Sequence, residues 1–288
     1  MDYVKNNIAN FCKKNKVNLI FLVVCLLVIF VSSFCASCIQ SDGFKVTVTD
    51  LRDETNTGTI TTTTVGEDGT PVETQTAVKG KVVSGILFVP KDASPEHPLP
   101  AVVLTHGYLN NREMQLQNAI ELARRGFIVL TVDREGHGNY DNSGKQNAMM
   151  ATNGLYDSAK YLYNLDIVDK SKIGISGHSM GGYTTAATLM ADKNVGIVSA
   201  GLMQAWSSFM GAGADVSVGF LKAKDDEFFF TTKENGGTIS RDFLSTTTAK
   251  KFLGLTAEDT IVNKGIYKQT ATGAELVTPQ GGQAVDGT

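Results

Sequence analysis

Cysteine is confined to one end of this sequence, and its absence elsewhere excludes several kinds of site. Residues 39–288 contain no cysteine, because all four lie in or beside an N-terminal apolar segment, at Cys12, Cys25, Cys35 and Cys38. The cysteine-free part has neither a disulfide framework nor a cysteine-based metal site. It also shows no histidine cluster and no glycine-rich phosphate loop, so we expect no metal and no organic cofactor.

Charge is sparse as well and nearly balanced. Lysine and arginine number 26 against 29 aspartate and glutamate residues, which gives a formal net charge of −3 at pH 7. This small net charge gives no indication of a nucleic acid partner. Hydrophobic residues make up 42% of the 288 residues, which predicts one large globular domain with an appendage.

The appendage is an apolar N-terminal segment. Leu19–Gln40 contains no charged residue, and a run of this length can span a bilayer as a helix, which needs about 20 residues. By the positive-inside rule, the lysines before it keep the N-terminus in the cytoplasm and the rest of the chain is exported. These lysines are Lys5, Lys13, Lys14 and Lys16. We predict a cytoplasmic N-terminus at 1–16, a transmembrane signal anchor at 17–40 and an extracytoplasmic domain at 43–288.

Two other signals would place the exported domain differently. A cleaved signal peptide would leave a secreted protein, but its apolar region is typically about 7–15 residues long, shorter than the run found here. A lipoprotein signal with Cys38 as the lipidated residue is less favoured still, because Cys35 stands where such signals usually carry leucine.

The first part of the exported domain alternates like antiparallel β-strands. The predicted strands are Phe44–Asp50, a hairpin of Thr57–Val65 and Val72–Val78 around the Asp68-Gly69 turn, and Lys81–Val89. The alternative for the threonine-rich stretch is a low-complexity stalk.

Beyond residue 100, short apolar runs alternate with helical patterns. The predicted strands are Ala101–Thr105, Phe127–Val132, Lys172–Ser176, Ile197–Gln204 and Val216–Ala223, and the predicted helices are Glu113–Arg125, Ala148–Leu165 and Tyr183–Asp192. This alternation implies crossover connections and a mostly parallel α/β sheet covered on both faces. Towards the end, Thr256–Gln269 is expected to be partly helical, and Gly273–Thr288 is polar and glycine-rich, without a buried strand.

The most informative stretch is Gly177-His178-Ser179-Met180-Gly181. G-x-S-x-G is the nucleophile-elbow pattern, in which a strand turns sharply into a helix with the serine at the bend. Here a β-rich run precedes the pattern and a helix of small residues follows it, which is the required context. We therefore predict that Ser179 is a nucleophile, rather than part of a plain strand-to-helix turn.

With three further stretches, this pattern resembles the α/β-hydrolase superfamily, in particular its dienelactone-hydrolase, acyl-peptidase and esterase-like branches. The three stretches are Thr105-His106-Gly107-Tyr108, Asp133-Arg134-Glu135-Gly136-His137-Gly138, and Asp166–Lys170 running into Ile173-Gly174-Ile175-Ser176. The resemblance covers about residues 81–230. It implies the α/β-hydrolase fold, a doubly wound and mostly parallel sheet.

The resemblance also implies an oxyanion hole and an acid. The backbone N–H groups of Tyr108 and Met180 would bind the developing anion, although Tyr108 could instead be a simple loop aromatic. Asp226 would be the acid, in the turn after Val216–Ala223, with Asp225 as the alternative residue. A solvated acidic turn without a catalytic role is the other interpretation.

No residue fills the position of the general base. In this fold the catalytic histidine follows the acid in the chain, yet the last histidine of this sequence is His178. Of the earlier ones, only His137 could approach the site, since His97 belongs to a surface loop and His106 to the oxyanion loop. We therefore expect that the sequence lacks its last strand and histidine loop, and that the 288-residue chain has little or no activity.

The resulting hypothesis is a membrane-anchored, extracytoplasmic serine hydrolase. It would cleave an ester, thioester or amide of a small-molecule or peptide acyl substrate through an acyl-enzyme on Ser179. The alternatives are a non-catalytic binding module of the same fold and an acyltransferase that uses the same nucleophile. Apart from the acyl substrate, the membrane is the one partner we expect.

Overall fold

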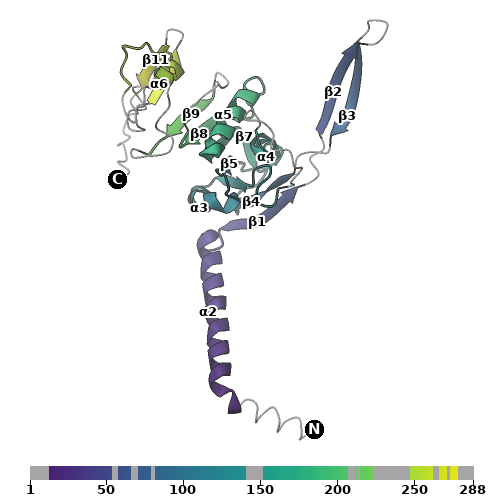
Figure 1. Cartoon of the computed structure of the whole chain (residues 1–288), viewed down its shortest axis with the longest axis vertical. Helices are drawn as coiled ribbons and strands as arrows, with labels where there is room; N and C mark the ends of the chain where they lie inside the picture. Colours follow the sequence, from purple (N-terminus) through teal and green to yellow (C-terminus); the bar gives the residue numbers. More distant parts are fainter. Residues whose placement is uncertain are drawn as a thin grey trace.

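The computed structural model describes two clearly different parts of the chain. A long N-terminal helix, α2 (Lys16–Gln40), leads into an α/β body (Figure 1). The described residues are 13–53, 58–65, 71–78, 82–140, 152–206, 212, 215–223, 247–261, 266–270 and 273–277.

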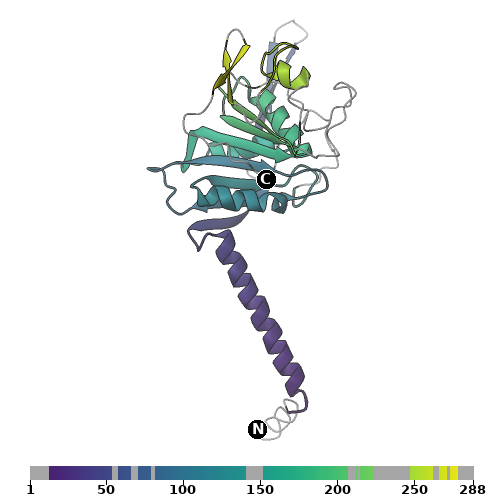
Figure 2. The same cartoon turned by 90° about the vertical axis from the view of Figure 1, so that its left-hand side faces the viewer.

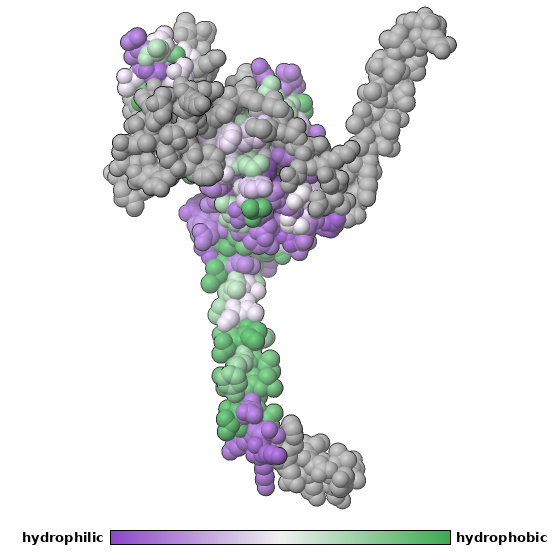
Figure 3. Space-filling view, viewed as in Figure 1, coloured by the Kyte–Doolittle hydropathy of each residue, from purple (hydrophilic) through white to green (hydrophobic). Residues whose placement is uncertain are grey.

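The helix α2 is apolar along most of its length and exposed. None of its 25 residues is buried, and Figure 3 shows mostly apolar surface along it, in contrast to the polar surface of the body. At about 1.5 Å per residue it is about 37 Å long, which exceeds a hydrocarbon core of about 30 Å. Within the described ranges it is the single helix that is long and apolar enough to cross a membrane.

Polar contacts join the end of α2 to the body. The N–H of Val46 donates to the carbonyl oxygen of Ser41 at 2.9 Å. The Arg124 side chain forms an ion pair with Asp42 at 3.4 Å and donates to the carbonyl oxygen of Ile39 at 3.1 Å. In Figure 2 the strands of the body run across the axis of α2, with the first strand directly above its end.

A seven-stranded sheet forms the body, in the order β1-β4-β6-β5-β7-β8-β9. β4 is antiparallel to both of its neighbours, and all pairs from β6 to β9 are parallel. The strands are β1 (Val46–Asp53), β4 (Val83–Pro90), β5 (Leu99–Thr105), β6 (Ile128–Val132), β7 (Val168–His178), β8 (Ala200–Gln204) and β9 (Ser217–Leu221). The predicted fold class, a mostly parallel sheet with N-terminal antiparallel strands, is therefore confirmed.

Helices cover both faces of the sheet, as a doubly wound fold requires. α4 (Leu155–Tyr163) and α5 (Met180–Asp192) pack in the larger hydrophobic core on one face. On the other face lies α3 (Leu116–Arg124), which follows the 3-10 helix η1 (Arg112–Gln115). Every residue of β6 is buried, because this central strand is covered from both sides.

Several predicted boundaries shift by a few residues. The helix predicted to start at Ala148 starts at Leu155, because Gly154 at φ 86° cannot continue a right-handed helix; residues 148–151 lie outside the described ranges. The strand before the elbow begins at Val168, four residues earlier than predicted, where Val168 pairs with Leu99.

Two separate antiparallel ribbons complete the described structure. β2 (Gly58–Val65) pairs with β3 (Pro71–Val78), which confirms the predicted hairpin, although its turn at Asp68-Gly69 lies outside the described residues. β10 (Ile266–Thr270) pairs with β11 (Gly273–Val277), after the short helix α6 (Thr247–Phe252). The helical prediction for Thr256–Gln269 is thus wrong at its end, where the β-prone Ile-Tyr-Lys-Gln-Thr run finds a pairing partner.

Candidate active site

Ser179 lies at the junction of β7 and α5, and its backbone is strained there. Its φ is 57° and its ψ is −117°, a region that residues with a side chain rarely occupy. Such strain persists only where the surroundings enforce it, and it is common at functional sites. The structure therefore contains the sharp strand-to-helix turn that the G-x-S-x-G pattern predicts.

The glycines around Ser179 are required by close backbone contacts. A Cβ atom on Gly177 would overlap the backbone of Gly181, and a Cβ on Gly181 would lie 2.7 Å from the carbonyl oxygen of His106. The elbow thus packs closely against the start of its own helix and the end of β5, and a larger residue at Gly177 or Gly181 would force these elements apart.

Two neighbouring strands fix the position of Ser179 at the carboxyl edge of the sheet. Thr105, the last residue of β5, is in register with Gly177 of β7. The N–H of Ser179 donates to the carbonyl oxygen of Gln204, the last residue of β8, at 2.9 Å. Ligand sites of open parallel sheets lie at this edge, beyond the carboxyl ends of the strands.

The loop after β5 passes directly beside the serine. An ideal Cβ on Gly107 would lie 3.3 Å from the Cβ of Ser179. Tyr108, the next residue, is about half exposed, and Met180 is the first residue of α5, where backbone N–H groups lack an intrahelical acceptor. Both residues proposed for the oxyanion hole thus flank Ser179, and their role as donors stays a prediction.

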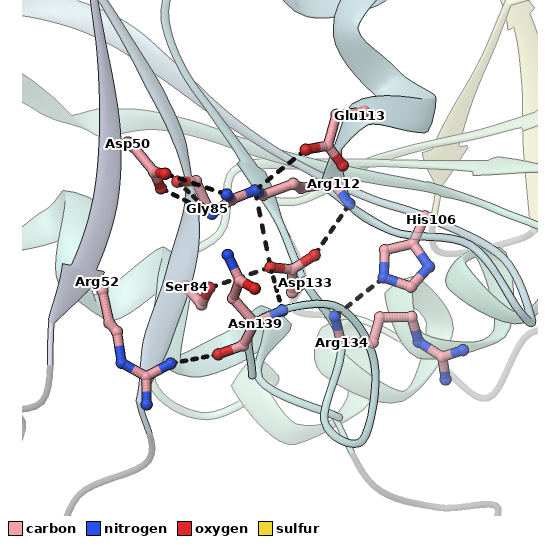
Figure 4. A network of polar contacts seen from close by, with 10 residues as sticks. All are labelled: Asp50, Arg52, Ser84, Gly85, His106, Arg112, Glu113, Asp133, Arg134 and Asn139. Carbon is pink, nitrogen blue, oxygen red and sulfur yellow. Dashed lines mark hydrogen bonds and ion pairs between the residues drawn. The ribbon is translucent and has the colours of Figure 1, made fainter. Parts of the chain in front are cut away.

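His106 is held as a neutral imidazole. Its Nδ1 lies 2.7 Å from the carbonyl oxygen of Gly107 and must carry a proton to donate to it, while its Nε2 accepts from the N–H of Arg134 at 3.1 Å (Figure 4). Burial lowers the pKa of His106 to about 4. With both nitrogens occupied, this side chain cannot act as a general base for Ser179.

The other three histidines form no hydrogen bond with the serine either. The ring of His137 packs edge-on against His106 and Tyr108, at centroid distances of 5.3 and 6.2 Å. The Nδ1 of His178 is buried without a hydrogen bond, and His97 contacts the surface loop at Asp92. In the part of the chain that the structure describes, no histidine forms a hydrogen bond with the Ser179 hydroxyl.

Asp133 organises the loop that follows β6, a role that sequence reasoning missed. Its buried carboxylate accepts hydrogen bonds from the Ser84 hydroxyl (3.0 Å) and from the N–H groups of Arg112 (3.1 Å) and Asn139 (3.1 Å) (Figure 4). Gly138, at φ 55°, lies so close that a Cβ would overlap this carboxylate. An aspartate directly after a buried strand and before two glycines was the available signal.

The acid predicted from the sequence is not described. Asp225 and Asp226 both lie outside the described residues. The preceding strand β9 is parallel to β8, so the chain leaves β9 at the same edge of the sheet as Ser179. Within the described ranges no group of three or more His, Cys, Asp or Glu side chains could hold a metal ion.

Comparison with known proteins identifies the family of this fold and site. The family model described as serine aminopeptidase, S33, matches residues 96–271, which is more than half of the chain. The Bacillus subtilis (strain 168) protein "Putative esterase YitV" is 28% identical over 128 residues, which covers 40% of this chain and 49% of that protein. The chain thus spans about half the length of this curated relative.

Two similar solved structures are named as an α/β-hydrolase and an esterase. The α/β-hydrolase GrgF from Penicillium sp. sh18 is 19% identical with a TM-score of 0.38, over 51% of this chain and 45% of GrgF. The hyperthermophilic esterase from Pyrobaculum calidifontis is 26% identical with a TM-score of 0.36, over 52% of this chain and 45% of the esterase. By the family model, the chain belongs to the serine aminopeptidase S33 family of α/β-hydrolases.

Proposed function

We propose that this protein is a serine hydrolase that cleaves an ester, thioester or amide through an acyl-enzyme on Ser179. The observation that carries the proposal is the strained backbone of this serine, at φ 57°, between the end of β7 and the start of α5. Such a turn lifts the hydroxyl above the sheet edge, where a substrate carbonyl can reach it. The esterase and peptidase names of the relatives support the same reaction class.

In the proposed reaction, the Ser179 hydroxyl oxygen attacks the acyl carbon and its proton passes to a general base. The N–H groups of Tyr108 and Met180 bind the resulting oxyanion. The leaving group takes the proton as the carbon–heteroatom bond breaks, and the acyl group stays on Ser179. Attack by water, assisted by the same base, then releases the acid and restores the serine.

The acid proposed for this reaction lies outside the described residues. We propose Asp226, with Asp225 as the alternative, as the acid that orients the base. No histidine follows Ser179 in the 288 residues, and the hydrogen bonds of His106 exclude it from this role. We therefore expect the 288-residue polypeptide by itself to hydrolyse model esters poorly.

For the location, we propose that α2 anchors the protein in a membrane and that the hydrolase domain is extracytoplasmic. The apolar surface of α2, where no residue is buried, and the lysines before it support an uncleaved anchor. Extraction of membranes with alkaline carbonate tests this proposal. The protein should remain in the membrane pellet; full release of a shortened protein would instead support a cleaved signal peptide.

Labelling with a fluorophosphonate probe tests the nucleophile. The protein expressed from its native gene should be labelled, and Ser179→Ala should abolish the signal. Ser171→Ala is the matched control, because the Ser171 hydroxyl is exposed and bonds only to the nearby Asp169. Labelling that is absent, or that survives Ser179→Ala, would overturn the proposal.

A non-catalytic binding module is the second candidate, because no histidine among the described residues forms a hydrogen bond with the Ser179 hydroxyl. The sequence encoded downstream of Thr288 separates the two. A strand followed by a histidine favours the enzyme, and a stop codon directly after Thr288 favours the binding module. Acyl transfer, which uses the same acyl-enzyme, is separated from hydrolysis by product analysis with added alcohol or amine acceptors.

A further inference from the structure

Arg134 is a buried cation whose guanidinium has no partner among the described residues. The residue is 2% exposed, and its Nε and Nη1 atoms are buried and form no hydrogen bond with the described residues. The hydrogen bonds of Arg134 come from its backbone: the N–H donates to His106, and the carbonyl oxygen accepts from the N–H of His137 at 2.9 Å. Figure 4 shows the guanidinium directed away from Asp133 and past the His106 ring, with no interaction drawn to it.

The neighbouring Arg112 shows how a buried arginine is normally satisfied in this fold. Its guanidinium forms an ion pair with Asp50 at 2.8 Å and lies 3.8 Å from Asp133. Arg134 has no such carboxylate within the described ranges. A buried charge without a partner destabilises a protein by several kcal/mol, so its presence calls for a counter-ion that binds there.

The position of Arg134 connects it to the proposed nucleophile. It follows β6, whose last residue Val132 is in register with Thr105 of β5, which in turn is beside Gly177 of β7. Its N–H binds His106, and the next residue of that loop, Gly107, approaches the Ser179 Cβ. The guanidinium therefore belongs to the same sheet edge as Ser179, two strands away.

The groups around Arg134 favour a carboxylate over a phosphate. A guanidinium presents a planar fork of N–H groups that matches the two oxygens of a carboxylate. The adjacent His106 is neutral by its hydrogen bonds and offers no second positive charge. Burial lowers the pKa of Arg134 to about 10, so it stays protonated at neutral pH. A single buried positive charge is balanced by a carboxylate monoanion and not by a phosphate dianion.

We propose that Arg134 binds a carboxylate group of the substrate, so that the preferred acyl substrates carry an acid group away from the bond that is cleaved. The inference that this ligand is the substrate rests on the proposed function. The existence of the carboxylate site does not, since binding can be measured without turnover.

Thermal unfolding of the Ser179→Ala protein tests binding in the absence of chemistry. Glutarate, a dicarboxylate, should raise the unfolding midpoint in a saturable way at constant ionic strength, whereas its dimethyl ester should not. Arg134→Gln should abolish this shift, and Arg125→Gln, which removes an exposed arginine paired with Glu121, should retain it. A shift that survives Arg134→Gln, no shift with glutarate, or an equal shift with inorganic phosphate would overturn the proposal.

A second variant separates a binding role from a purely structural one. Arg134→Met fills the same space without a charge, so it should raise the unfolding midpoint of the ligand-free protein by about 2–4 °C while losing the glutarate shift. A lower midpoint would show that Arg134 supports the fold through a partner of its own, and would overturn the proposal.

If Arg134→Met does not fold, Arg134→Lys replaces it. This variant keeps the charge but not the planar fork, and should weaken glutarate binding at least about tenfold; unchanged binding would contradict the proposal.

Labelling of the wild-type protein links the site to the substrate. A fluorophosphonate with a terminal carboxylate should react faster than its methyl ester, and Arg134→Gln should reduce this ratio at least about tenfold. An unchanged ratio would overturn the assignment to the substrate. If Ser179 reacts with neither probe, the proposed function fails, while the unfolding measurements still decide the carboxylate site.

Discussion

The backbone N–H of Arg134 donates to Nε2 of His106 at 3.1 Å, which ties the loop after β6 to the loop after β5. This bond requires that Nε2 carries no proton. The histidine is therefore a structural acceptor at the edge of the candidate site, and protonation of its ring would break the connection.

The titration of His106 makes the stability of the fold depend on pH. Burial lowers the pKa of His106 from an ordinary value of 6.5 to about 4. Between these values the unfolded chain takes up a proton and the folded chain does not. The free energy of unfolding should thus be highest above pH 6.5 and fall by about 3 kcal/mol as the pH decreases to 4. Urea denaturation at a series of pH values measures this change.

The variant His106→Gln serves as the control for this titration, because an amide cannot titrate. Its free energy of unfolding should be lower than that of the wild type at pH 7 by about 1–3 kcal/mol, since the N–H of Arg134 loses a well-placed acceptor. The fall between pH 6.5 and 4 should be much smaller in this variant. An equally steep fall in His106→Gln would assign the pH dependence to other groups.

Ser179 stores backbone strain that glycine would not have. Because the residue sits at φ 57°, Ser179→Gly should increase the free energy of unfolding by about 1 kcal/mol. Ser179→Ala removes the same hydroxyl but keeps the strain, so it should leave the stability nearly unchanged. Chemical denaturation of the two variants side by side measures the difference. Equal stability of the two would show that the elbow is not strained.

Gly181, near the start of α5, faces neighbouring backbone and should tolerate alanine far less well than Gly174 of β7. Gly181→Ala places a methyl group 2.7 Å from the carbonyl oxygen of His106 and 2.9 Å from that of Thr105. Backbone atoms cannot move aside as side chains do, so we expect a loss of more than about 3 kcal/mol or a failure to fold.

Gly174→Ala is the matched control, because its nearest neighbour would lie at an ordinary 3.6 Å, on the Val102 side chain. It should change the free energy of unfolding by less than about 1 kcal/mol. The yield of soluble protein and its denaturation midpoint measure both variants. A Gly181→Ala protein as stable as Gly174→Ala would contradict the close packing of the elbow against β5.

The parts of the fold that the sequence predicts well are those set by local pattern. The apolar run of β6, the alternating hairpin of β2 and β3, and the G-x-S-x-G turn at Ser179 each depend on a few neighbouring residues. The long-range contacts were not predictable in this way. Nothing local to Asp133 indicates that Ser84, 49 residues earlier, would donate to it, and the missing partner of Arg134 becomes visible only when its burial is known. The Asp226 assignment stays a prediction.

The carboxylate of Asp133 should be among the most sensitive polar groups of the protein. It is 2% exposed and accepts hydrogen bonds from Ser84, Arg112 and Asn139. In Asp133→Asn one oxygen becomes an N–H₂ group, which faces donors and cannot accept from them. We expect a loss of about 2–4 kcal/mol in the free energy of unfolding, measured by urea denaturation.

The same variant should also reduce the labelling of Ser179, because Asp133 holds the loop after β6, and His137 of this loop packs against His106 and Tyr108 of the loop that passes the serine. Asp169→Asn is the control. Asp169 likewise accepts several bonds, from Ser171 and Lys172, and the Lys172 ammonium is the main cause that lowers its pKa to about 2. It lies at the surface, however, where water replaces these partners. Loss of stability and labelling in Asp133→Asn but not in Asp169→Asn is the expected outcome. Equal, small effects would show that the hydrogen bonds of the Asp133 carboxylate are dispensable, and that the loop after β6 is held in place by other contacts.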